Sequence, residues 1–131
     1  VLEFGSRRAQ GADGAIMGAR AAYIGGCAGT ACTLVDRDMQ IPALGTMAHS
    51  WVQMFPSEED AFRAYAQTYP DNCTLLVDTY NVLQSGIPNA IKIFNEEVVS
   101  RGYRPKAVRI DSGDIAYLSK KVRKLLDAAG F

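Results

Sequence analysis

The chain has 131 residues, and its 14 lysines and arginines balance 14 aspartates and glutamates, so the formal net charge is zero. A module that binds nucleic acid normally carries a basic excess, so nucleic acid is not expected as a partner. Apolar residues make up 48% of the chain and charged residues 21%, which is typical of a globular core and not of a disordered segment. No apolar run reaches the roughly 18 to 20 residues of a membrane-spanning helix, so no membrane association is expected.

The cysteines and the first residue indicate where the protein is found and how much of it is present. Cys27, Cys32 and Cys73 form an odd set without the spacing of a zinc site, which indicates reduced thiols in a cytoplasmic protein. The chain begins with Val1, inside a predicted strand, and not with Met. We therefore expect it to be a piece of a longer protein.

The first part of the chain predicts short strands around two helices. Residues 1–4 are the first strand candidate, and residues 13–23 follow with small and apolar side chains at helical spacing, up to two glycines that end the helix. Weaker strand patterns at residues 29–32 and 43–48 flank a brief helix near residues 34–39.

The second part predicts longer elements. Ser57 stands before three acidic residues, which predicts a capped helix start, and Pro70 ends that helix. A continuous apolar strand, a helix opened by Pro88, another strand and a final amphipathic helix follow at residues 74–77, 88–98, 107–110 and 115–129.

Strands that alternate with helices imply parallel strands joined by helical crossovers in one α/β domain over residues 1–131. Two architectures fit this pattern. One is a flavodoxin-like doubly wound sheet, complete in this length. The other is a set of βα units forming part of an incomplete TIM-like barrel, whose closed form needs about 250 residues. In both architectures a ligand binds at the carboxyl ends of the strands.

Arginines and acids gather at the predicted strand ends. Arg7 and Arg8 beside Phe4 offer bidentate contacts to a carboxylate or phosphate and a ring for stacking, although surface ion pairs explain the arginines equally well. Residues 111–114, Asp-Ser-Gly-Asp, can bind Mg²⁺, ribose hydroxyls or phosphate. The same turn is also a good helix start, with Asp114 as the N-cap.

His49, the only histidine, follows the predicted strand at residues 43–48. An imidazole there can act as a base or accept a phosphoryl group, although a lone histidine is commonly a structural hydrogen-bonding group. Cys32 is a possible nucleophile, but a small buried apolar role explains it more simply. The glycine-rich run at residues 25–30 lacks the ending of a P-loop and the spacing of a dinucleotide fingerprint.

Four segments, in order and in register, resemble nicotinate phosphoribosyltransferase: residues 3–11, 45–51, 76–80 and 109–114. The resemblance covers essentially the whole chain and favours the incomplete barrel, because that family has a longer chain with an N-terminal domain and further barrel strands. It implies an enzyme of NAD salvage that converts nicotinate and phosphoribosyl pyrophosphate to nicotinate mononucleotide and pyrophosphate, coupled to ATP hydrolysis and assisted by Mg²⁺. It also implies a homodimer or higher oligomer for the full-length enzyme, and little or no turnover by this piece alone.

The resemblance assigns roles to the matching positions. His49 matches the histidine that ATP phosphorylates, and with Asp111 and Asp114 it forms the implied catalytic set. The two aspartates are also the implied metal ligands. The implied substrate-binding residues are Phe4, which would stack on the pyridine ring, and Arg7, Arg8, Thr30, Ser50, Arg109, Ser112 and Gly113.

One departure bears on the substrate. The related nicotinamide enzyme has an aspartate where this chain has Ala31, so no acid here would repel the carboxylate of nicotinate. Nicotinate is therefore favoured over nicotinamide. The alternative from another class is a non-catalytic phosphate- or nucleotide-binding flavodoxin-like module. A receiver-like version would need an acidic pair closing its first strand and a lysine closing its last, which this chain lacks.

Overall fold

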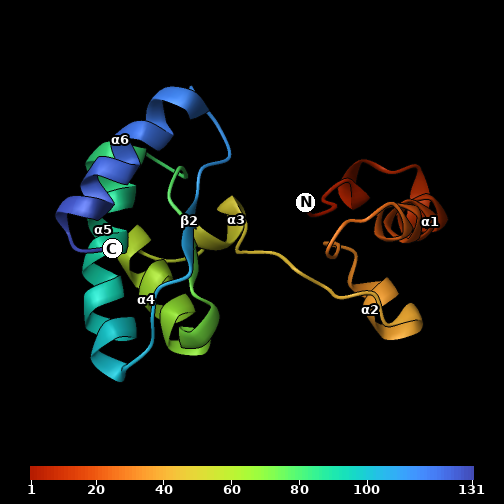
Figure 1. The fold of residues 1–131 in the computed structure, drawn as a ribbon, viewed down its shortest axis with the longest axis horizontal. Coiled ribbons are helices and arrows are strands. Elements are labelled where there is room, and N and C mark those ends of the chain that lie inside the picture. Colours follow the sequence, from red (N-terminus) through yellow and green to blue (C-terminus); the bar gives the residue numbers. More distant parts are fainter. The chain divides into compact units, whose positions relative to one another are not determined.

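The computed structural model describes all 131 residues, which separate into two compact units, residues 1–45 and 46–131 (Figure 1). None of the helices has both the length and the apolar character that crossing a bilayer requires. Each unit has its own core.

The first unit is built around helix α1 (Gly11–Ile24), which follows the 3₁₀ turn η1 (Ser6–Arg8) and precedes helix α2 (Thr33–Met39). Both helices were predicted, and α1 ends at the expected pair of glycines. Small and aliphatic side chains from the helices and the segments after them form the core: Ala19, Cys32, Val35 and Ile41.

The prediction of strands at residues 1–4, 29–32 and 43–48 is wrong, because the structure has only single parallel bridges in these segments. Thr30 pairs with Glu3 on one side and with Ala43 on the other. Extended pairing stops there for local reasons: Gly29 lies against the carbonyl oxygen of Pro42, and Pro42 has no N–H to donate to a ladder.

The second unit contains a parallel strand pair at its centre. Strand β1 (Thr74–Leu76) pairs with β2 (Ala107–Arg109), with Leu75 opposite Val108. The interior of β1 is fully buried, as its continuous apolar run predicted, whereas β2 is partly exposed. The fold is thus a mixture of helices and strands, and its strands are parallel as expected.

Helices α4 (Glu58–Thr68) and α6 (Ile115–Ala128) begin at side-chain caps. The hydroxyl of Ser57 accepts a hydrogen bond from the Asp60 N–H at 3.1 Å, and α4 ends before Pro70, as predicted. Pro70 starts a short 3₁₀ turn, η2 (Pro70–Asn72). The sequence did not predict the four-residue helix α3 (His49–Val52), which directly follows residues 43–48.

The helix expected to open at Pro88 begins six residues earlier. The side-chain oxygen of Asn81 accepts the N–H groups of Leu83 and Gln84, which starts a continuous helical run at Val82. Pro88 lies in the first turn of α5, where its missing N–H is tolerated. The run consists of the π-helical turn η3 (Val82–Gly86), α5 (Ile87–Ile93), the π-helical turn η4 (Phe94–Val98) and the 3₁₀ turn η5 (Val99–Arg101).

Helix α5 lies between α4 and α6 and contacts both (Figure 1). Apolar side chains from these helices and from β1 form the core of the second unit, with Phe62, Phe94, Leu75, Leu76, Ile87 and Ile93 as its largest members. The guanidinium of Arg63 on α4 makes ion pairs with three carboxylates, Glu59, Glu96 and Glu97. The pairs with Glu96 and Glu97 join α4 to η4, and the pair with Glu59 lies within α4.

Gly86 provides a test of this packing. A Cβ atom at this position would lie 1.9 Å from the carbonyl oxygen of Val77, at the end of β1. We expect Gly86→Ala to lower the free energy of unfolding by about 3 kcal/mol, measured by urea denaturation. Gly18→Ala is the control, because its Cβ would meet nothing within 4 Å in the exposed middle of α1. Equal stability of the two variants would contradict the close approach of η3 to β1.

Candidate functional site

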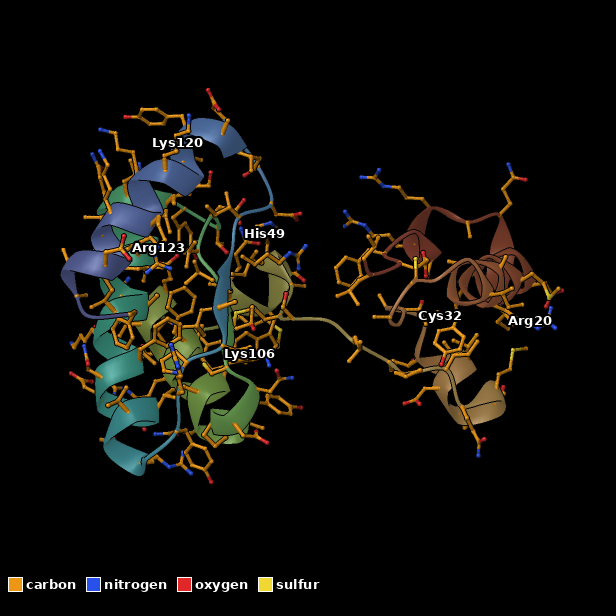
Figure 2. All side chains as sticks on the ribbon, viewed as in Figure 1. Arg20, Cys32, His49, Lys106, Lys120 and Arg123 are labelled. Atoms are coloured by element: carbon orange, nitrogen blue, oxygen red, sulfur yellow. The ribbon has the colours of Figure 1, made fainter.

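The carboxyl ends of β1 and β2 meet the start of α3 at one place in the second unit. His49 is the first residue of α3 and lies beside the strand pair (Figure 2). Its Nδ1 atom is 3.2 Å from the hydroxyl of Thr79. Its Nε2 atom is 3.8 Å from a carboxylate oxygen of Asp78 and 3.5 Å from one of Asp111. Both ring nitrogens therefore face polar groups at the strand ends.

Asp78 links the two strand ends. Its Oδ2 atom accepts hydrogen bonds from the Asp111 N–H at 2.9 Å and from the Ser112 hydroxyl. The side chain is only 2% exposed, and its other oxygen, Oδ1, is buried without a hydrogen-bond partner. This oxygen is the one that lies nearest the His49 ring, so it is an acceptor available to a ligand at the site.

Arg109, the last residue of β2, orients Asp111. Its Nη2 atom is 3.0 Å from the Asp111 carboxylate, and its Nη1 atom donates to the hydroxyl of Thr46 at 2.8 Å. The hydrogen bond from Arg109 holds the pKa of Asp111 below its ordinary value of 3.8, and His49 contributes in the same direction. Asp111 is therefore a charged carboxylate at neutral pH.

This arrangement can support two kinds of chemistry. Fixed partners on both ring nitrogens hold an imidazole in one orientation, which suits proton transfer or nucleophilic attack. The two carboxylates stabilise positive charge on the ring, and their oxygens are donors that Mg²⁺ accepts. No group of three or more His, Cys, Asp or Glu side chains forms a complete metal site in the chain.

Several residues expected from the sequence do come together here: His49, Arg109, Asp111 and Ser112. Ser50 follows His49 in α3 and is exposed. Gly113 has φ +77° in the exposed turn before α6. Asp114 has the structural role that was the alternative, because its carboxylate accepts the Tyr117 N–H at 2.9 Å as the N-cap of α6.

The other predicted residues belong to the first unit. Phe4, Arg7 and Arg8 are exposed, as residues that contact a substrate would be, and the two arginines form part of η1. Thr30 is fully buried instead. Its hydroxyl donates to the Glu3 carboxylate and accepts the Cys32 N–H at 2.9 Å, so its side chain holds the local bridges together.

Sequence reasoning assigned no individual role to Asp78, Thr79 and Thr46, although all three lie in the segments at residues 45–51 and 76–80 that carry the resemblance. A signal existed for Asp78, because it follows the buried strand β1 just as Asp111 follows the next strand, and carboxyl ends of parallel strands share an edge. The partners of the two threonines did not follow from the sequence, since these contacts join residues distant along the chain.

Comparison with models of known protein families gives no match. Individual proteins do match. The nicotinate phosphoribosyltransferase of Bacillus subtilis is 50% identical over 134 residues, covering 100% of this chain and 26% of the relative. The nicotinate phosphoribosyltransferase pncB2 of Mycobacterium tuberculosis is 47% identical over 130 residues, covering 99% of this chain and 27% of the relative.

The fold agrees with these sequences. A crystal structure of human nicotinic acid phosphoribosyltransferase superimposes with a TM-score of 0.89 at 30% identity, covering 98% of this chain and 35% of that chain. The chain is homologous to part of the nicotinate phosphoribosyltransferases. It spans about a quarter of the length of the bacterial nicotinate phosphoribosyltransferases it matches. These relatives favour the phosphoribosyltransferase interpretation over a flavodoxin-like binding module.

The contact between Arg109 and Asp111 gives a prediction on pH dependence. Arg109→Gln is expected to raise the pKa of Asp111 toward 3.8, because the charged donor is lost, and ¹³C NMR of the carboxyl group measures it. A lowered pKa in the folded state stabilises the fold above pH 3.8, and this stabilisation is lost as the pH falls further. The acid-induced loss of stability should therefore be smaller in the variant.

The control for this titration is Arg123→Gln, which removes an exposed pair with Asp127 within α6. It should leave the titration of Asp111 unchanged. If Asp111 titrates identically in the Arg109 and Arg123 variants, Arg109 does not set its charge.

Proposed function

We propose that this chain is part of a nicotinate phosphoribosyltransferase. The enzyme forms nicotinate mononucleotide and pyrophosphate from nicotinate and phosphoribosyl pyrophosphate, with ATP hydrolysis, in NAD salvage. The observation that carries the proposal is the placement of His49 between Asp78 and Asp111, in a chain homologous to such enzymes along its whole length.

In this proposal His49 accepts a phosphoryl group from ATP. A ring nitrogen attacks the γ-phosphorus, an N–P bond forms, and the bond to the ADP oxygen breaks. Positive charge develops on the ring during attack, and the carboxylates of Asp78 and Asp111 are close enough to stabilise it. The hydroxyl of Thr79 holds the ring in place.

Mg²⁺ is the expected metal, and the carboxylates fit it. Mg²⁺ is commonly bound by one or two carboxylates together with substrate phosphates and water, and this arrangement needs no complete protein site. The buried, unpartnered oxygen of Asp78 and the charged carboxylate of Asp111 provide two such ligands. Asp78 is added to the expected pair of Asp111 and Asp114, and Asp114 also caps α6. The metal would neutralise phosphate charge when bound.

The remaining residues bind the substrates in this proposal. Phe4 stacks on the pyridine ring, and Arg7 and Arg8 contact its carboxylate or the phosphates. Ala31 places no acidic side chain where it would repel the carboxylate of nicotinate. The residues around the ribose and phosphates are Ser50, Arg109, Ser112 and Gly113.

For the whole enzyme we propose that residues 1–131 are part of a single α/β barrel domain. The parallel pair β1 and β2, with a helical crossover between them, is the unit from which such barrels are built. An incomplete barrel leaves strand edges uncovered, and the exposure of β2 is consistent with a further strand beside it. Three free cysteines support a cytoplasmic location, and the enzyme is proposed to be a homodimer or higher oligomer.

The proposal predicts that the 131-residue chain alone makes no nicotinate mononucleotide, but supports the reaction within a complete enzyme. The test is a chimaera in which this chain replaces the matching segment of the Bacillus subtilis protein. We expect the chimaera to form nicotinate mononucleotide with stimulation by ATP, and His49→Ala to abolish that stimulation. Product is measured by chromatography.

The matched control is Gln53→Ala, at the exposed end of the same short helix, which should retain ATP stimulation. An inactive chimaera that is folded would contradict the proposed activity. Persistent ATP stimulation in His49→Ala would contradict the role of His49.

A further inference from the structure

Glu58, the first residue of α4, is a buried carboxylate outside the site described above. It is 5% exposed. Its Oε2 atom accepts hydrogen bonds from the Ser85 hydroxyl and the Asn89 side-chain amide, each at 2.9 Å. Its Oε1 atom is buried without a hydrogen-bond partner. Burying a carboxyl group with one of its two oxygens unpartnered is costly in free energy, which raises the question of what Glu58 does at this position.

The two donors belong to the helical run that follows the end of β1. Ser85 lies in η3 and Asn89 in α5. The backbone N–H of Ser85 donates to the carbonyl of Asn81 at 3.0 Å, and the Ser85 hydroxyl lies 3.3 Å from the same oxygen. Asn81 caps the run and is only two residues from Thr79, the partner of the His49 ring. The carboxylate of Glu58 is thus connected by hydrogen bonds to the segment that faces His49.

The same turn also contacts the end of β1 directly. The backbone of Gly86 approaches the carbonyl of Val77 so closely that no side chain fits between them. Val77 is followed by Asp78 and Thr79. A shift of η3 away from α4 would therefore move the loop at residues 78–81.

Helix α4 also supports α3, which carries His49. The ring of Trp51 on α3 packs edge-on against Tyr65 of α4, with 5.9 Å between ring centroids. Helix α4 therefore holds both sides of the contact between His49 and Thr79. One side is held by aromatic packing and the other by the carboxylate of Glu58.

We propose that Glu58 is a positioning residue that holds the segment 78–81 against His49, through Ser85 and Asn89. Its importance for catalysis rests on the proposed function, but its effect on the geometry of His49 does not. The role requires an acceptor at position 58, and a negative charge is not needed. Glu58→Gln should therefore preserve it and Glu58→Ala should remove it.

The experiment is NMR of the 131-residue chain, where His49 is the only histidine and its ring signals are unambiguous. Measurements are the ring ¹⁵N chemical shifts and the NOEs from the ring to the Thr79 methyl group. The matched control is Glu97→Ala. It also removes a contact of α4 with the same helical run, through Arg63 and Gln67, but at η4.

In Glu58→Ala we expect the ring shifts to change and the NOEs to Thr79 to be lost, while Glu58→Gln and Glu97→Ala keep the wild-type pattern. Unchanged His49 signals in Glu58→Ala would overturn the proposal, and so would equal changes in Glu97→Ala. If Glu58→Ala does not fold, the same NMR measurements are made on Ser85→Ala, which removes one donor to Glu58. Lost NOEs to Thr79 would support the proposal, and unchanged His49 signals would overturn it. Because no activity is measured, failure of the proposed function leaves this result interpretable.

Discussion

The buried carboxylate of Asp78 holds the ends of the two parallel strands together, and the geometry of the candidate site depends on it. One of its oxygens accepts the Asp111 N–H and the Ser112 hydroxyl, and the other lies near the His49 ring. A buried carboxylate needs such donors, since an unpaired one is costly to desolvate. Because Asp78 needs these two donors, the end of β2 lies beside the end of β1. This places the Asp111 carboxylate near the His49 ring.

The elements that sequence reasoning predicted well are those specified by neighbouring residues. Helix α4 has its cap at Ser57 and its stop at Pro70, and β1 is a continuous apolar run. The bridges at Thr30 were overestimated as strands, because strand pairing depends on residues far along the chain, and Gly29 and Pro42 prevent a longer ladder. The early start of the helix at Val82 depends on the cap made by Asn81, which the choice of Pro88 as the opening residue overlooked.

The candidate site was predictable to a similar extent. The positions of Arg109 and Asp111 followed from the end of a strand, and that of His49 followed from the family resemblance. The structure brings the three together. The importance of Asp78 was overlooked, although its place after β1 matches that of Asp111 after β2. Its hydrogen bonds to residues more than 30 positions away reveal it. The capping role of Asp114, one of its two predicted roles, is seen directly in the hydrogen bond from the Tyr117 N–H to its carboxylate.

In the proposed function, His49, Asp78 and Asp111 form one site that responds to a phosphoryl group on the histidine. The most direct measurement treats the chain with phosphoramidate, a small donor that phosphorylates histidine without needing an ATP site, and follows the backbone amides by ¹H–¹⁵N NMR. If the three residues form one site, we expect the backbone amide chemical shifts of Thr79, Asp111 and Ser112 to change together with that of His49. Shifts confined to His49 and its neighbours in α3 would contradict it.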